Sequence, residues 1–129
     1  MAITVTATRI YPANKAKNIS AAEGVSEVNG TAETFETVFP AKDETCYFLV
    51  KNGNVAPIQV KLLASCANNG FTESNYTVSK NTICAIGIES GFVKDVNGKV
   101  SIKATPGSAT TLKLSGVTVS AIYSGVGTN

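Results

Sequence analysis

The stretch CYFLVKNGNVAPIQVKLL, residues 46–63, joins two different kinds of predicted β-strand. Its first five residues, 46–50, are all apolar, which is typical of a central strand covered on both faces. Residues 58–62 instead alternate apolar and polar side chains, the pattern of a strand with one face in the core and one in water. Between them, Asn52 and Gly53 both accept positive φ and therefore predict a tight hairpin turn. The stretch indicates two strands of an all-β protein.

The same period of two recurs along most of the chain. Residues 3–8, 99–104 and 117–123 alternate in this way. Residues 83–88 are apolar on both faces, so they predict a second central strand. Short strands separated by turn signals predict one antiparallel β-sandwich over residues 1–129, either jelly-roll or immunoglobulin-like. The expected inward-facing residues are Ile3, Val5, Phe48, Val50, Val60, Leu62, Ile86, Ile88, Val100, Ile102, Val117 and Val119.

Asn-Gly turns occur at three further positions, residues 29–30, 69–70 and 97–98. In the last of them, Asp95 and Asn97 precede Gly98 at the spacing of a calcium-binding loop. The first and last ligand positions of such a loop would be Val93 and Ala104, neither of which has a side chain that coordinates the ion. We therefore expect a hairpin at residues 95–98.

Residues 10–36 form the exception to the strand pattern, a long excursion near the N-terminus. Ser20 and Glu23 have the spacing of a capping box, so the segment is expected to hold one short helix or, alternatively, a strand and loop of the sandwich. A polar insertion of this length is not needed to close a core, and we expect an arm that orders on contact with a partner. The candidate anchors are its apolar residues, Tyr11, Ile19, Val25, Val28 and Phe35. Phe92 is either a further anchor or a plug over the end of the sandwich.

Composition narrows the class of protein. Hydrophobic residues make up 43% of the 129 residues and charged residues 16%, which is typical of a globular domain. The net charge is only +2, with no basic stripe, so no nucleic-acid partner is expected. The N-terminus lacks the features of a signal peptide, no apolar run is long enough for a membrane span, and synthesis in a cytoplasm is expected. The three cysteines are then expected to be reduced.

The chain offers little catalytic chemistry. It contains no His, which removes the commonest general base and most catalytic metal sites. The spacing of its carboxylates favours no catalytic pair, and no phosphate-binding or dinucleotide-binding motif is present. We therefore expect neither an enzyme nor a protein that binds a metal or cofactor.

The order of motifs resembles a known family. An alternating ITVTATRIYPAN is followed by FLVKNGN, PIQVKLLAS, YTVSKNTICAIGIESGFVKDVNGKVSI and GVTVSAIYS. This order is similar to that of the small β-sandwich auxiliary or decoration proteins of tailed bacteriophage heads. The resemblance covers most of residues 44–123 and the first strand. It implies a structural protein of the virion, on the capsid exterior, with the major capsid protein as partner and either one copy or a small cyclic homo-oligomer as the bound form.

A carbohydrate-binding or adhesin-type β-sandwich is the alternative. Such modules usually present Trp and Tyr side chains as flat platforms for sugar rings. This chain has four Tyr and no Trp, so the alternative depends on where those tyrosines lie.

Overall fold

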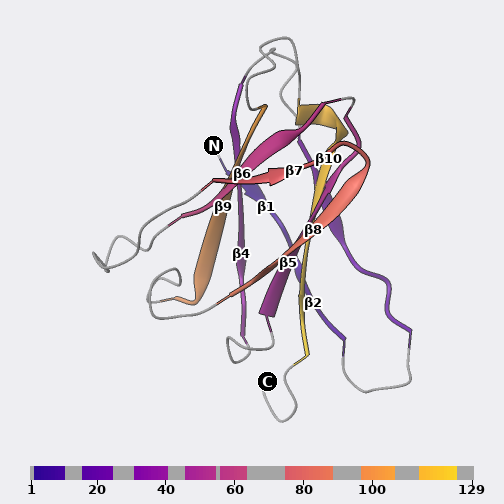
Figure 1. Ribbon diagram of the computed structural model, residues 1–129. Helices are drawn as coiled ribbons and strands as arrows, with labels where there is room; N and C mark the ends of the chain where they lie inside the picture. Colours follow the sequence, from indigo (N-terminus) through magenta and orange to yellow (C-terminus); the bar gives the residue numbers. More distant parts are fainter. Residues whose placement is uncertain are drawn as a thin grey trace.

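The computed structural model describes most of the chain and shows an all-β protein (Figure 1). Apart from one turn of 3-10 helix, η2 (Leu114–Gly116), every regular element in the described part is a strand, as predicted. The described residues are 2–10, 16–24, 31–40, 46–54, 56–63, 75–88, 97–106 and 114–124.

The strands form two sheets. The first contains, in spatial order, β1 (Ile3–Thr4), β4 (Glu33–Val38), β9 (Lys99–Thr105), β6 (Ile58–Leu62) and β7 (Asn75–Val78). The second contains β2 (Ala7–Arg9), β10 (Val117–Tyr123), β5 (Cys46–Asn52) and β8 (Thr82–Gly87), and β3 (Ala21–Glu23) also pairs with β10. One buried cluster takes residues from both sheets, so the sheets face each other across a common core, an arrangement compatible with a β-sandwich.

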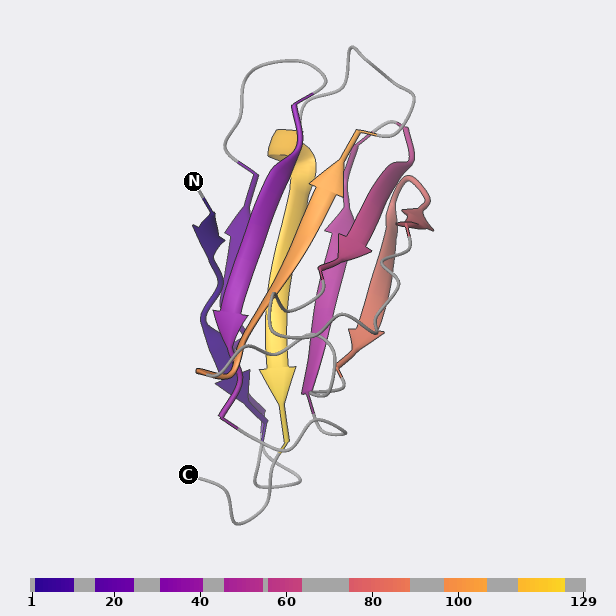
Figure 2. The same ribbon diagram turned by 90° about the vertical axis from the view of Figure 1, so that its left-hand side faces the viewer.

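We expected purely antiparallel pairing, but both sheets contain parallel as well as antiparallel pairs of strands. The inner strands pair antiparallel, but β1 runs parallel to β4 and β2 runs parallel to β10. The N-terminal segment runs along β4 and then passes directly to β10 without reversing its direction, and Figure 2 shows β1 and β2 in succession along one margin. Both pairs at this margin are parallel because β4 and β10 run in the same direction as β1 and β2.

The core is close to the one predicted from alternation. All of the expected inward-facing residues are buried except Ile3, which is half-buried and packs against the core. Phe39 and Phe48 meet edge to face with ring centroids 5.5 Å apart. The remaining buried apolar residues are Phe35, Cys46, Ile58, Val78, Ala104, Leu114 and Ala121.

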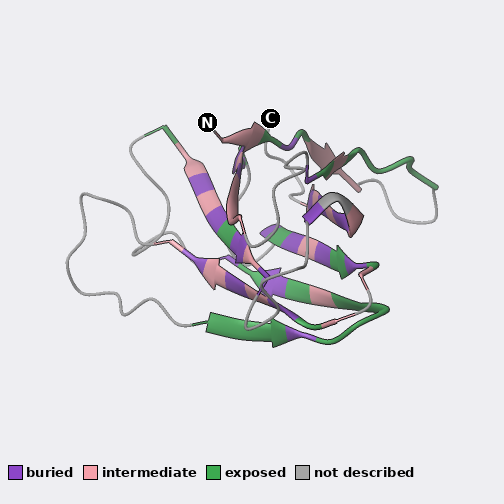
Figure 3. Cartoon of the chain, turned by 90° about the horizontal axis from the view of Figure 1, so that it is seen from above, coloured by how far each residue is buried: buried purple, intermediate pink, exposed green. Residues whose placement is uncertain are grey.

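The two wholly apolar runs are not covered on both faces, and that expectation was wrong. In β5, Tyr47 and Lys51 are exposed while their neighbours are buried. In β8, Ile83 is 64% exposed, and β8 is the last strand of its sheet. Figure 3 shows the exposed residues of β7 and β8 at one margin. A two-layer protein covers each sheet on one face only, so an apolar run does not by itself report a second covering layer.

One Asn-Gly turn also differs from expectation. Neither Asn52 nor Gly53 has a positive φ, and β5 and β6 lie in different sheets, so their connection crosses between sheets and closes no hairpin. At residues 97–98, Gly98 has φ of 79°, and β8 and β9 lie in different sheets, but residues 89–96, which include the first arm of the expected hairpin, lie outside the described residues. The dipeptide signals a reversal of the chain but does not specify the partner of the next strand.

The structure describes only part of the expected arm, residues 10, 16–24 and 31–36. The strands within this part belong to the two sheets. Ala21–Glu23 is a strand on β10 and not the first turn of a helix. Glu33–Val38 lies between β1 and β9, and Phe35 is fully buried. Pairing with β10 satisfies the backbone of residues 21–23 without a helix, which explains why the capping-box pattern misled. The alternative of a strand within the fold is what the described part of residues 10–36 shows.

Candidate functional site

The candidate anchor residues separate into three groups. Ile19 is 42% exposed and remains available for contact. Phe35 is buried in the core shared by both sheets and is therefore not a surface anchor. Tyr11, Val25, Val28 and Phe92 lie outside the described residues.

One side of the two-sheet core is closed by the N-terminal segment. We call this margin, built by residues 3–10, the closed side. The backbone N–H of Val5 donates to the carbonyl oxygen of Glu36 in the first sheet at 2.8 Å. The N–H of Ile10 donates to the carbonyl oxygen of Tyr123 in the second sheet at 2.8 Å. Because one short segment bonds to both sheets, it fastens them together along this side.

A groove of about 300 Å³ opens where this segment crosses between the sheets. Val38, at the end of β4, is 51% exposed. Thr37 is buried beneath it, and its hydroxyl oxygen has no hydrogen-bond partner. The groove is lined by Thr4, Val5, Thr6, Ala7, Thr37, Val38, Pro40 and Tyr123.

The lining sets what the groove can hold. The described lining residues include no carboxylate and no ammonium or guanidinium group, so none of them offers an ion-pair partner to a charged ligand. Aliphatic carbons, the Pro ring and the Tyr123 ring are suited to an apolar side chain of another molecule, and the Thr4 and Thr6 hydroxyls to polar atoms at its rim. The arrangement binds a partner's side chain by burial and shape.

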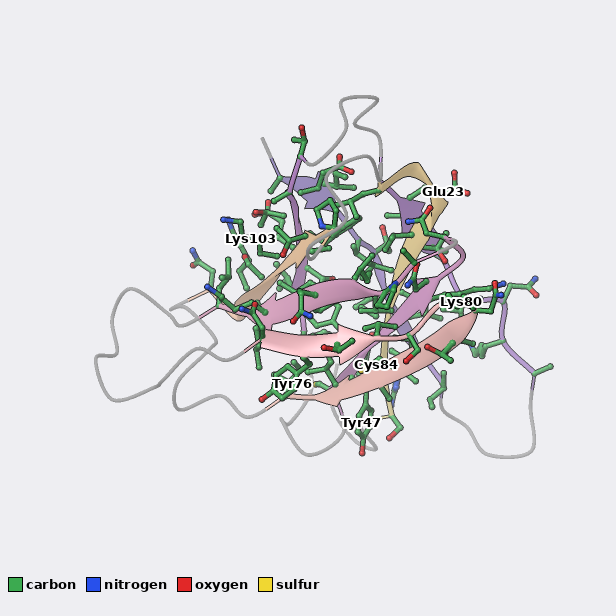
Figure 4. The ribbon with its side chains drawn as sticks, turned by 45° about the horizontal axis from the view of Figure 1, so that its top comes forward. Glu23, Tyr47, Tyr76, Lys80, Cys84 and Lys103 are labelled. Carbon is green, nitrogen blue, oxygen red and sulfur yellow. The ribbon has the colours of Figure 1, made fainter. Side chains whose placement is uncertain are left out.

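The opposite side, which we call the open side, is formed by β7 and β8. These strands follow each other in the chain, end their respective sheets, and are joined through a turn in which Asn81 has φ of 57°. Figure 4 shows Tyr47, Tyr76 and Cys84 on the neighbouring strands β5, β7 and β8. Tyr76 is 49% exposed, whereas Cys84 is half-buried and, like the fully buried Cys46, is not part of a disulfide.

On the open side, the turn between β7 and β8 crosses from the first sheet to the second, and the N–H of Asn81 in this turn donates to the carbonyl oxygen of Asn52 at 2.8 Å. The side chain of Asn52 adds a second link there. Its amide nitrogen lies 2.9 Å from the carbonyl oxygen of Ala56, 3.0 Å from that of Val78 and 3.3 Å from that of Ser79. Its amide oxygen accepts from the N–H of Asn54 at 3.0 Å. Asn52 thus joins the end of β5 in the second sheet to the end of β7 in the first. The sequence analysis placed this residue in a turn. Its position two and four residues after Val50 and Phe48 puts it on the same buried face of β5, and this spacing was the signal for a buried residue of the strand.

Comparisons of the chain with protein-family models, with curated proteins and with solved structures returned no match. The described residues include no helix able to span a membrane. They also contain no group of three His, Cys, Asp or Glu residues placed to hold a metal ion.

Proposed function

We propose that the protein is a virion structural protein, an auxiliary or decoration protein that binds the major capsid protein on the exterior of a tailed-phage head after synthesis in the host cytoplasm. It acts by attachment and not by catalysis. The observation that carries the proposal is the uncharged groove on the closed side with Val38 exposed beside it. The resemblance in motif order, from FLVKNGN to GVTVSAIYS, supports the same class.

The fold is proposed to be an immunoglobulin-like sandwich and not a jelly roll. Among the seven strands β4 to β10, the second pairs with the fifth and the third with the sixth, as strands B with E and C with F do in immunoglobulin domains. The outer strands differ from that pattern, because β4 pairs with β9 and β10 pairs with β5. The first and last strands have thus exchanged sheets relative to an immunoglobulin domain, and the fourth strand, β7, pairs with β6 and not with β8.

Attachment through the groove fits a repetitive partner. An apolar side chain of a capsid subunit would fill the groove and cover Val38, contributing about 1.5–3 kcal/mol by burial. One such contact is weak. On a lattice, linked copies gain affinity because the second contact forms at high effective concentration. The N–H of Ser20 donates to the hydroxyl oxygen of Thr8 in β2, so this part of the chain lies on the closed side. The neighbouring Ile19 is exposed and extends the apolar contact along that side.

Val38→Asp tests the groove. A carboxylate at this position places a charge where an apolar side chain of the partner would be buried, so binding to purified heads should weaken at least tenfold. The fold should be retained, because Val38 is exposed and its cross-strand partner Lys99 can pair with the new carboxylate. Tyr76→Asp is the matched control, because Tyr76 on the open side is almost equally exposed and undergoes the same apolar-to-acid change. Co-sedimentation with heads measures both. Equal binding by Val38→Asp and the unmodified protein would remove the groove from the attachment surface.

Carbohydrate binding is the second candidate, because Tyr47 and Tyr76 are both exposed near the open side. Tyrosine faces can support sugar rings. Titration with oligosaccharides, monitored by tyrosine fluorescence, should show saturable binding that Tyr76→Ala abolishes if this candidate is correct. In that case Tyr76→Asp, and not Val38→Asp, would be the variant that loses function.

A further inference from the structure

Strand β8 has the longest free edge in the described part of the fold. It contains six residues, whereas β1, β2 and β3 contain two or three and β7 contains four. Natural edge strands are usually shortened, charged, interrupted by Pro or covered. The sequence TICAIG of β8 has no charged residue and no Pro, and Ile83, Ala85 and Gly87 are exposed. The edge therefore lacks the usual protection against pairing.

The direction of the free backbone groups follows from the ladder with β5. The N–H of Ile88 donates to the carbonyl oxygen of Cys46, and Cys46 would be the partner of Ile88 in the register of β5 with β8. Backbone groups alternate in direction along an antiparallel strand. Cys84 and Ile86 thus bond toward β5, and the N–H and C=O groups of Ile83, Ala85 and Gly87 point to the open edge.

We propose that β8 pairs antiparallel with β8 of a second copy of this chain, about a two-fold axis through Ala85. Ile83 of each copy then lies opposite Gly87 of the other, and the two Ala85 residues face each other. The residues paired in this register are the ones whose backbone groups are free, so the ladder is satisfied on both strands. The pairing joins the two second sheets into one continuous sheet and closes as a dimer.

The shape of the outer face favours a second copy as the occupant. Gly87 leaves room beside it, because a Cβ built there would lie 3.7 Å from the Tyr47 ring, an ordinary contact distance. Ile83 is the most exposed of the large apolar side chains in the described part, and no described strand pairs with it on the open edge. In the proposed register, Ile83 of one copy enters the space over Gly87 of the other and packs toward Tyr47. The Ile83 side chain and the space over Gly87 that it fills are both on β8, so two copies of the same strand are complementary.

Charge and area agree with a weak self-association. Antiparallel self-pairing places each residue of Thr82–Gly87 against another of the same stretch, and none is charged, so no like charges oppose each other. Pairing along a single strand buries less than the roughly 1,200 Å² that stable interfaces need. We expect a dissociation constant in the micromolar range or weaker, roughly 1–100 μM, which the high local concentration on a lattice would offset.

A charge exchange at Ala85 tests the proposal in solution, without phage particles, and therefore independently of the proposed function. Sedimentation velocity of the unmodified protein should show a monomer–dimer equilibrium. Ala85→Lys and Ala85→Glu each place like charges on the axis and should weaken dimerisation at least roughly tenfold. An equimolar mixture of the two variants should restore the dimer, because opposite charges then face each other. Recovery on mixing is specific to a register with residue 85 on the axis.

Gly87→Ala provides a second, conservative variant. The added methyl group makes only ordinary contact with Tyr47 within one copy, so the monomer should remain folded by circular dichroism. It occupies the space that Ile83 of the second copy needs, and dimerisation should weaken. The proposal is overturned if the unmodified protein stays monomeric up to about 1 mM. It is also overturned if Ala85→Lys and Ala85→Glu fail to associate when they are mixed. A third contradicting result is that these variants lose binding to heads while the unmodified protein is a monomer, because a strand of a capsid protein would then pair with the edge of β8.

Discussion

The closed side and the open side hold the same two sheets together by different means. On the closed side, residues 3–10 bond to β4 in one sheet and β10 in the other, so the chain itself bridges the core. On the open side, the turn between β7 and β8 crosses between the sheets, and the buried amide of Asn52 links β5 to β7. The edges differ accordingly: short parallel strands on one side, a six-residue antiparallel strand on the other.

This difference indicates a division of roles. A side fastened by backbone bonds and buried apolar residues provides a rigid groove, which suits recognition of another protein's side chain. A side joined by a turn and by the Asn52 side chain leaves the edge of β8 free within the described part of the chain, which suits pairing with another strand. The following substitutions are directed at the two sides, beginning with the largest expected effect.

Phe35→Ala should have the largest effect on stability. Phe35 pairs with Ile3 and Ile102 and is fully buried, so its removal leaves a cavity next to the closing strand. The expected loss in free energy of unfolding is about 4 kcal/mol, measured by urea denaturation. Ile19→Ala is the control on the same side and should change it by less than about 0.5 kcal/mol. A similar small change at both positions would mean that Phe35 is a surface residue after all.

Asn52→Ala should come next and tests the fastening of the open side. It leaves the carbonyl oxygens of Val78 and Ala56 without their donor, and the expected loss is about 3 kcal/mol. Asn75→Ala, at an exposed position of β7, is the control and should be nearly neutral. If thermal unfolding is unaffected by Asn52→Ala, the open side must be held by other contacts.

Val5→Ala and Ile83→Ala form a matched pair of truncations across the two sides. Val5 is buried where the chain crosses between sheets, and its truncation should destabilise by about 2 kcal/mol. Ile83 is largely exposed, and its truncation should change the stability of the monomer by less than about 0.5 kcal/mol while weakening dimerisation. A large loss of monomer stability on truncating Ile83 would show that the open side is already covered within one copy.

Alternation was a reliable guide to the core for a physical reason. Val100 and Ile102 are buried with polar neighbours outside, because a strand in a two-layer protein has one face in the core. In Glu33–Val38 the residue types do not alternate in this way, because Phe35 shares its buried face with Thr37 while Val38 is exposed on the other face. The length and polarity of residues 10–36 led instead to an arm, since local composition does not reveal that β4 fills an inner position of a sheet.

Contacts between residues distant in sequence could not be predicted. Asn52 meets Val78 across 26 positions, and the groove brings Thr4 to Ala7 beside Val38 and Tyr123. The Asn-Gly signal at residue 52 was local, and its burial depends on which sheets β5 and β6 join. The free edge of β8 could not be predicted either, because an apolar run has the same sequence pattern in a central strand and in an edge strand.

Amide hydrogen exchange by NMR tests the contrast between the two sides most directly. It is best measured on Ala85→Glu, in which self-association is suppressed. The N–H groups of Ile83 and Gly87 should exchange almost as fast as in an unfolded chain, whereas those of Ile86, Ile88 and, on the closed side, Val5 should be protected at least about a hundredfold. Equal protection of Ile83, Gly87 and Ile86 would contradict the account, because the edge of β8 would then be bonded within a single copy and not open.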